Sequence, residues 1–382
     1  MVASSPIMTQ AQDDYSNSNR ELDERTWIRE AHSVVADLMQ HRPAVYWTDL
    51  LASSALAWGA TALYFLSDPW SGWQLLGLVL AGIGFYRAGT FMHEIIHLPS
   101  GELVQFKRAW NLLIGIPLMM PWVLYRNHIG HHSRVHFGTP ADGEYLPLAS
   151  APLRETLIYL LKLPFLPLLV LARFALAAPL SWLVPPLREW VLTRASALAS
   201  NPYYAKRFPA RDERHLLIIE ICCLAWIAFW LAMTWFGPVE PIHWLMVWVL
   251  HAFTLGLNWV RNLAAHRYDN RGEPMSHLAQ LQDAVNITGQ TWLTCWLFPV
   301  GLRYHALHHL FPGLPYHSMG EAHRRLIKHF GVNSPYASAN HHSFFGVVSD
   351  LLRGASRTPP AESAIQVWRQ AGQGRASGKM AG

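Results

Sequence analysis

The sequence predicts an all-α integral membrane protein, with four transmembrane helices in two hairpins and a cytoplasmic helical cap that carries clustered histidines. Of the 382 residues, 51% are hydrophobic and only 14% are charged, whereas about a quarter of the residues in a soluble protein are charged. Four apolar stretches are each roughly 20 residues long, enough for a helix to cross a hydrocarbon core of about 30 Å. The net charge is only +5 and the basic residues are scattered among helix ends, which argues against nucleic-acid binding.

Three regions of different composition predict the domain organisation. Residues 1–44 are polar and mixed in charge, and they lack the apolar core and cleavage site of a signal peptide, so we expect a cytoplasmic N-terminal segment. Residues 45–345 contain all the long apolar stretches and should form the membrane domain. Residues 346–382 are rich in small and polar residues with Pro and Gly, which predicts a disordered C-terminal tail.

The four predicted spans fall into two pairs. Residues 47–66 and 73–92 are separated only by Ser-Asp-Pro-Trp-Ser-Gly, and residues 216–236 and 242–260 only by Gly-Pro-Val-Glu-Pro. Neither connection contains Lys or Arg, whereas basic residues collect at the opposite ends of the spans. The positive-inside bias therefore predicts that both termini and all polar segments are cytoplasmic, and we expect a multi-pass protein of the bacterial inner membrane.

Three further apolar stretches are harder to place. Residues 109–125 and 153–187 are interrupted by prolines, and residues 292–302 are too short to span. An odd number of extra crossings would put the histidine clusters on opposite faces of the membrane. We therefore predict interfacial or re-entrant segments, with an extra hairpin inside 153–187 as the main alternative.

Nine of the 21 histidines fall into four short clusters that also include one asparagine. Two clusters have the spacing HxxxH or NxxxH and two have HxxHH, and residues three or four apart share one face of a helix. Neutral imidazole is the commonest metal ligand, but ten donors are too many for one tetrahedral zinc and suit two metal ions side by side. The predicted ligands are His93, His97, His128, His131, His132, Asn262, His266, His305, His308 and His309.

Other polar residues near these clusters are expected to support the ligands. Asn262, at a predicted helix end, either reaches a metal directly or through water, or caps its helix. Carboxylates near the clusters should accept N–H hydrogen bonds from ligating imidazoles. The candidates for such supporting positions are Glu94, His136, Asp142, Asp269 and Asp283, with Glu144 also close in sequence.

The segment His93-Glu-Ile-Ile-His97 also matches the zincin signature, in which two histidines hold zinc and the glutamate is the general base. A zinc intramembrane protease is therefore an alternative from another class. It would need one more carboxylate ligand and would leave the other seven clustered histidines unused. A transporter or a metal-binding membrane protein is the non-enzymatic alternative.

Taken together, these residues resemble the membrane fatty acid desaturase superfamily. Its three histidine boxes match His93–His97, His128–His132 and His305–His309, and the Asn262-x-x-x-His266 pattern resembles a further ligand of desaturases. The resemblance implies two irons, O₂ as co-substrate and a lipid or fatty acyl substrate in the membrane. It also implies a separate electron donor of the ferredoxin, rubredoxin or cytochrome b5 type, because no cytochrome b5 haem motif is present in the chain.

Within that superfamily we expect a desaturase that introduces a double bond into an alkyl chain. The segment His308-His309-Leu-Phe-Pro is similar to acyl-lipid desaturases, whereas the glycine in Asn127-His128-Ile-Gly-His-His is similar to alkane hydroxylases. The resemblance leaves open a fatty-acid or alkane hydroxylase, a carotenoid ketolase and a decarboxylating enzyme that forms terminal alkenes. The chain of the substrate should enter a tunnel between the spans, with its head group at the cytoplasmic surface.

Overall fold

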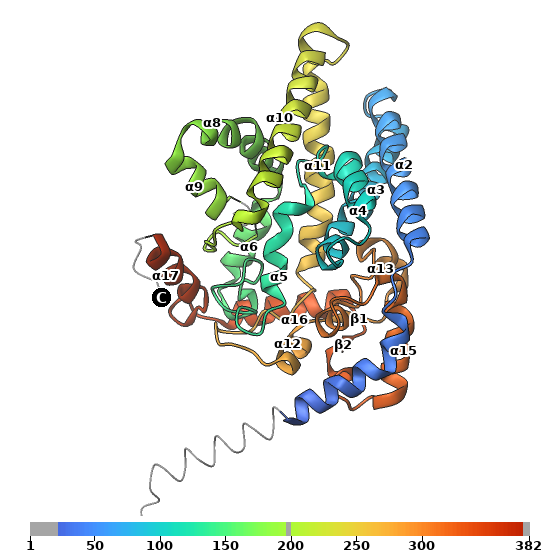
Figure 1. The fold of residues 1–382 in the computed structure, drawn as a ribbon, viewed down its shortest axis with the longest axis vertical. Coiled ribbons are helices and arrows are strands. Elements are labelled where there is room, and N and C mark those ends of the chain that lie inside the picture. Colours follow the sequence, from blue (N-terminus) through green and yellow to red (C-terminus); the bar gives the residue numbers. More distant parts are fainter. Residues whose placement is uncertain (1–21, 196–199, 377–382) are drawn as a thin grey trace, which may run out of the picture.

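The computed structural model of the protein describes residues 22–195 and 200–376. In these ranges the fold is mostly helical, and long helices above a cap of short helices give it an elongated shape (Figure 1). Four helices are long and apolar enough to cross a membrane. The predicted class, an all-α integral membrane protein, is therefore confirmed.

The first two long helices pack closely along their length. They are α2 (Pro43–Leu66) and α3 (Gly72–His97). Ser71 begins α3 by accepting a hydrogen bond from the backbone N–H of Gln74. A Cβ atom on Gly77 would lie 2.5 Å from the backbone nitrogen of Tyr64, so only glycine permits this close approach of the two helices. Helix α3 continues past the apolar stretch and carries the first histidine cluster at its end.

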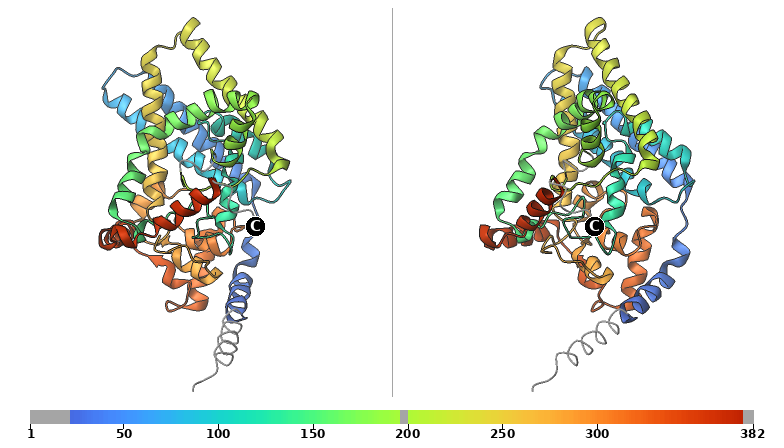
Figure 2. Two further views of the ribbon diagram at one scale, coloured as in Figure 1. Left: turned by 90° about the vertical axis from the view of Figure 1, so that its left-hand side faces the viewer. Right: turned by 60° about the vertical axis from the view of Figure 1, so that its left-hand side comes forward.

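The second pair of long helices is α10 (Glu213–Phe236) and α11 (Pro241–Asn262). The side views show α11 running from the tip of this hairpin down to the cap (Figure 2). Of the two, only α10 meets the length and hydropathy of a membrane span, within Ala210–Phe236. Helix α11 is interrupted by polar residues, including His251, Asn258 and Arg261, and it packs against α3.

Besides α2, α3 and α10, the helical stretch Leu153–Leu183 is long and apolar enough to cross a membrane. The predicted span 242–260 is not. The stretch Leu153–Leu183 belongs to a segment of residues 153–193 that we call the apolar arm. The arm stays helical because Pro164, Pro167 and Pro179 each lie in the first turn of a short helix, where proline is tolerated. The arm consists of α6 (Leu153–Leu161), α7 (Leu166–Ala172), α8 (Ala178–Leu183) and α9 (Pro185–Thr193), with a π-helical turn at Arg173–Ala177.

Both ends of the apolar arm are held at the cap. Before the arm, the Ser150 hydroxyl donates to the backbone carbonyl of Asp269 at 2.7 Å. After the arm, the Asn201 amide donates to the backbone carbonyl of Asp142 at 2.8 Å. The chain therefore enters and leaves the arm on the same side, as a re-entrant segment or an extra hairpin would, and not as a single crossing.

The cap is built from short helices joined by loops. Residues 22–35 form a helix whose Ala31 and Val35 pack with Ala322 and Leu326 of the cap. Two short strands pair in parallel, with Asn286 opposite Asn340. The remaining elements of the cap and its junction are α4 (Val104–Trp110), α5 (Asn127–His131), α12 (His277–Asp283), β1 (Asn286–Ile287), α13 (Thr291–Leu297), α14 (His305–Leu310), α15 (Met319–Phe330) and β2 (Asn340–His341).

The structure differs from the predicted disordered tail. Helices α16 (Phe344–Arg357) and α17 (Ile365–Ala376) follow the cap, and Trp368 is fully buried. The apolar residues of α16 lie on one helical face, a pattern that the overall polar composition of the segment conceals. Residues 377–382 of the predicted tail, and residues 1–21 of the predicted N-terminal segment, lie outside the described residues.

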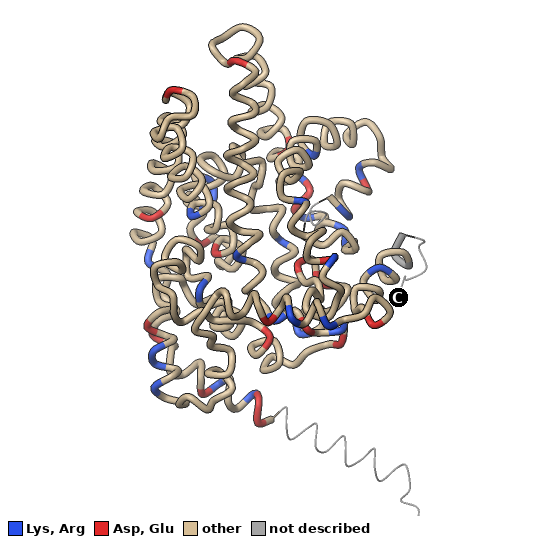
Figure 3. Tube along the Cα trace, turned by 180° about the vertical axis from the view of Figure 1, so that it is seen from behind, with Lys and Arg blue, Asp and Glu red and all other residues tan. Residues whose placement is uncertain are grey.

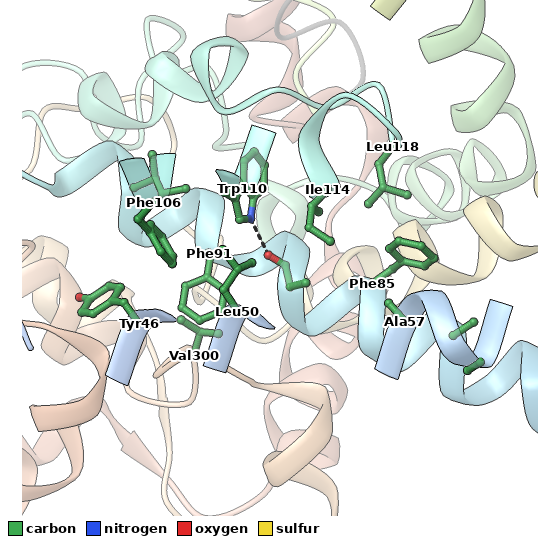
Figure 4. Packing of buried hydrophobic residues seen from close by; sticks show 14 of the residues in the cluster. Tyr46, Leu50, Ala57, Phe85, Phe91, Phe106, Trp110, Ile114, Leu118 and Val300 are labelled. Carbon is green, nitrogen blue, oxygen red and sulfur yellow. Dashed lines mark hydrogen bonds between the residues drawn. The ribbon is translucent and has the colours of Figure 1, made fainter. Parts of the chain in front are cut away.

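A buried aromatic cluster joins the first two spans to α4. Trp110 donates from its indole nitrogen to the backbone carbonyl of Ala88 at 2.7 Å, and Phe91 and Phe106 pack beside it (Figure 4). This contact anchors α4 against the middle of α3 and so fixes the chain that leads from the first histidine cluster to the second.

Charged residues are unevenly distributed along the long axis. They gather in and around the cap, and the far tips of the long helices carry few (Figure 3). The tip connections at residues 67–71 and 237–240 contain Asp68 and Glu240 but no Lys or Arg.

Candidate metal centre

The structure brings all nine clustered histidines together. They come from the end of α3, from α5 and its C-cap, from the turn after α11, and from α14. They form two groups, in each of which the possible ligand atoms lie within 4.8 Å of one another. The first group is His93, His97, His128, His132 and His308, and the second group is His131, His266, His305 and His309.

The Nε2 atoms within each group face one another at short range. In the first group the Nε2 atom of His132 lies 2.9 Å from that of His128 and 3.1 Å from that of His308. In the second group the Nε2 atom of His266 lies 3.2 Å from that of His131 and 3.0 Å from that of His305. Two imidazole nitrogens that bind one ion at a right angle, each about 2.1 Å from it, would be about 3.0 Å apart. The observed distances between Nε2 atoms are close to this value.

Several imidazole nitrogens in this centre are buried without a hydrogen-bond partner among the described residues. They include Nε2 of His93, Nε2 of His97 and both ring nitrogens of His309. A buried polar atom without a partner is costly, and native structures rarely leave many of them in one place. Metal ions bound to the two groups would satisfy these atoms, so the donor set fits two ions.

Three carboxylates orient histidines of the centre through contacts with the Nδ1 atoms. The Nδ1 atom of His131 lies 2.8 Å from Oδ2 of Asp142, and Nδ1 of His266 lies 3.0 Å from Oδ2 of Asp283. Glu144 faces Nδ1 of His128 at 3.1 Å. Each contact places the ring proton on Nδ1 and leaves Nε2 free for a metal. All three are among the carboxylates near the clusters from which the sequence predicts such acceptors.

Burial controls the protonation of these groups. It raises the pKa of Glu144 and the pKa of Asp283, each to about 7. It also lowers the pKa of six imidazoles, which keeps them in the neutral form that binds metal. These six are His128, His132, His266, His305, His308 and His309.

His131 and Asp142 differ from these groups because each shifts the pKa of the other. Burial alone would lower the pKa of His131, but the facing Asp142 carboxylate raises it. Burial would likewise raise the pKa of Asp142, but His131 and two backbone N–H groups hold it below its usual range.

Glu94, predicted as a support for the ligands, has another role in the structure. Its Oε2 atom accepts hydrogen bonds from the Tyr46 hydroxyl at 2.7 Å and from the Tyr316 backbone N–H at 3.2 Å. It therefore ties α3 to α2 and to the loop before α15. Glu94 follows His93 by one residue, about 100° around the helix, and its side chain is directed toward Tyr46 of α2.

Asp269, His136 and Asn262 lie at the edge of the centre. Asp269 uses its backbone carbonyl to hold Ser150, and none of its hydrogen bonds in the described part of the chain is to an imidazole. His136 lies in the turn after α5 and belongs to neither histidine group. Asn262 ends α11, lines the cavity beside the histidines, and interacts through its side chain with the hydroxyl of Tyr159.

Two adjoining cavities meet at the histidines. The larger, of about 180 Å³, is lined by polar residues including Glu144, Asn258 and several of the imidazoles. The smaller, of about 90 Å³, lies between α3 and α11 and is mainly apolar, with Phe85, Ile114 and Leu118 in its wall. The predicted tunnel for the substrate chain stays a prediction, and this cavity is the apolar space between the long helices that adjoins the histidines.

Comparisons with known proteins identify the family. The model of the family described as "Fatty acid desaturase" matches residues 68–340, which include both histidine groups. The chain is also 38% identical over 332 residues to a ceramide hydroxylase of Caulobacter vibrioides (strain NA1000 / CB15N), an alignment that covers 85% of this chain and 93% of that protein. Together with the paired histidine groups, these matches show that the chain belongs to the fatty acid desaturase family.

Proposed function

We propose that the protein is an O₂-dependent diiron enzyme that hydroxylates the alkyl chain of a membrane lipid. The observation that carries this proposal is the position of two imidazole groups beside an apolar cavity between the long helices. Two bound irons would supply the oxidising power to remove hydrogen from an unactivated methylene. Affinity order alone does not select iron over zinc or copper, so the choice of iron rests on the family.

The nine histidines would hold the two ions, five on the first and four on the second. Asn262 lines the same cavity and would complete the set through a water molecule. Asp142, Asp283 and Glu144 would keep three of the rings in the correct tautomer. The reaction would join one oxygen atom of O₂ to the substrate and reduce the other to water, and it would consume two electrons and two protons.

Desaturation, expected from the sequence, is the second candidate. It uses the same centre, O₂, electrons and protons, but a second hydrogen atom leaves the neighbouring carbon and both oxygen atoms become water. The family described as "Fatty acid desaturase" favours this outcome. The similarity to a ceramide hydroxylase along most of both chains favours hydroxylation, and it suggests a ceramide-like lipid as substrate.

The zinc protease hypothesis accounts for fewer observations. A protease would require a carboxylate as the third ligand beside His93 and His97. Instead, those two residues share their group with three further imidazoles, and Glu94 is engaged by Tyr46 and Tyr316.

The charge distribution supports a cytoplasmic active site. Lys and Arg residues gather around the cap and also occur along the apolar arm, but they are absent from the tip connections (Figure 3). The cap, which carries most of the histidines, would then face the cytoplasm of a bacterial inner membrane. There a separate ferredoxin, rubredoxin or cytochrome b5 type donor would supply the electrons.

Lipid profiling of a host that expresses the chain tests this proposal. Hydroxylation adds one oxygen atom to a lipid, whereas desaturation removes two hydrogen atoms, and mass spectrometry separates the two products. Metal analysis of the purified protein should find two irons per chain. One zinc per chain, with no O₂ consumption, would contradict the proposal.

A further inference from the structure

Arg261 is a buried cation where the two cavities meet. It is the penultimate residue of α11, only 6% of it is exposed, and it lines both cavities together with His93 and Tyr125. Its Nη2 atom donates to Oδ1 of Asn258 at 2.8 Å. Its Nε atom is buried and has no hydrogen-bond partner among the described residues.

The charge of Arg261 is not balanced by a direct ion pair. Within residues 22–195 and 200–376, no carboxylate forms a salt bridge with it, although Glu144 lines the same larger cavity. Arg173 provides a comparison, because it is buried to a similar degree but pairs with Glu220 at 2.7 Å. A buried charge without a partner is costly, so such a group normally has a partner supplied from elsewhere.

We propose that Arg261 positions the lipid substrate by donating hydrogen bonds to one of its acceptor oxygens. The guanidinium group offers planar N–H donors that suit both a carboxylate and the carbonyl of an amide or ester. This inference rests on the proposed function and adds a specificity-determining residue to it.

The position of Arg261 would fix how far the bound oxygen of the substrate lies from the carbon that reacts. An oxygen held there would lie beside His93, which belongs to the first histidine group. The alkyl chain would extend from that point into the apolar cavity lined by Phe85 and Leu118. Lipids with an oxygen function near the reacting methylene would then be preferred over plain hydrocarbons.

Binding of three matched probes to the purified, iron-loaded protein in detergent tests the proposal without turnover. Palmitic acid offers a carboxylate, palmitamide offers an amide carbonyl, and hexadecane offers no oxygen. Their affinities are measured by displacement of a fluorescent fatty acid from wild type, Arg261→Gln and Arg261→Lys. Arg173→Lys is the matched control, since Arg173 is also buried but lines neither cavity.

Wild type should bind an oxygenated probe more tightly than hexadecane. Arg261→Gln should lower the affinity for that probe between about tenfold and a hundredfold, the range for a hydrogen bond to a charged group. The affinity for hexadecane should not change. Arg261→Lys should recover part of the lost affinity, and Arg173→Lys should bind every probe as tightly as wild type. If only palmitic acid loses affinity in Arg261→Gln, the oxygen that Arg261 binds belongs to a carboxylate. If only palmitamide loses affinity, that oxygen belongs to a carbonyl group.

Equal weakening of all three probes, or none in Arg261→Gln, would overturn the proposal. Iron content and the midpoint of thermal unfolding, measured on every variant, separate a binding effect from misfolding. If the protein forms no oxidised lipid at all, the proposed function fails, but the binding results still decide the role of Arg261.

Discussion

The Nδ1 atom of His131 lies 2.8 Å from Oδ2 of Asp142, and both side chains are almost completely buried. This is the shortest of the three contacts between an imidazole of the centre and a carboxylate. Asp142 is held in turn by the backbone N–H groups of Gly138 and Glu144, so the pair is rigid.

Asp142→Asn should therefore weaken iron binding while preserving the shape of the site. The amide oxygen carries no full negative charge and is a weaker acceptor for the Nδ1–H of His131, and loss of such a support typically costs between about tenfold and a hundredfold in metal affinity. Iron affinity is measured by competition with a chelator. Asp269→Asn is the control, because the hydrogen bonds of Asp269 do not reach an imidazole. Equal iron affinity in both variants would show that the Asp142 contact is not needed.

Removing one imidazole from either group should abolish turnover. His132→Ala removes a ligand from the first group and His309→Ala one from the second, and each should also lower the iron content of the purified protein. His277→Ala is the control, since His277 belongs to neither group and lies at the start of α12. Full activity in either group variant would contradict the assignment of that group as a metal site.

The close contact between α2 and α3 should be sensitive to a single methyl group. Gly77→Ala forces a Cβ atom against the backbone of Tyr64, and overpacking of this kind costs about 1–3 kcal/mol. Thermal unfolding in detergent should show a lower midpoint. At Gly59, on α2, a Cβ atom would meet nothing within 4 Å, so Gly59→Ala should not destabilise the protein. A midpoint for Gly77→Ala equal to that of wild type would show that the helices separate easily.

Filling the smaller cavity should change the lengths of chain that react. Gly89 lines this cavity, and a Cβ atom there would meet nothing within 4 Å, so Gly89→Leu would place its side chain in open space. We expect the product profile to shift toward lipids with shorter alkyl chains, as measured by mass spectrometry of extracted lipids. Gly59→Leu adds the same side chain to the exposed face of α2 and should leave the profile unchanged. An unaltered profile in Gly89→Leu would place the reacting chain elsewhere.

The convergence of the histidines was predictable because it follows from spacing and topology. Residues three and four apart share a helix face, and two hairpins return the chain to one side. The division into two groups requires one more step. His131 and His132 are consecutive, so their directions differ by about 100° around a helix, and the structure assigns them to different groups. The same holds for His308 and His309.

Other features depend on contacts that the sequence does not specify. Asp142 and Asp283 face imidazoles and Asp269 does not, although all three lie near the clusters in sequence. Asp142 and Asp283 are 11 and 17 residues from the imidazoles that they face, so the path of the intervening loops, and not closeness in sequence, makes the difference. The sequence shows Arg261 only as a basic residue that follows a predicted span, because its burial depends on packing between α3 and α11.

The buried Trp368 links the last described helix to the second histidine group. Its indole nitrogen donates to the Tyr145 carbonyl at 3.1 Å, and the Tyr145 hydroxyl donates to Asp283, which faces His266. Shortening the chain before α17 would remove Trp368, and with it the contact that holds Tyr145 against Asp283. Expression tags and fusion partners are therefore better attached through a spacer that leaves this helix docked.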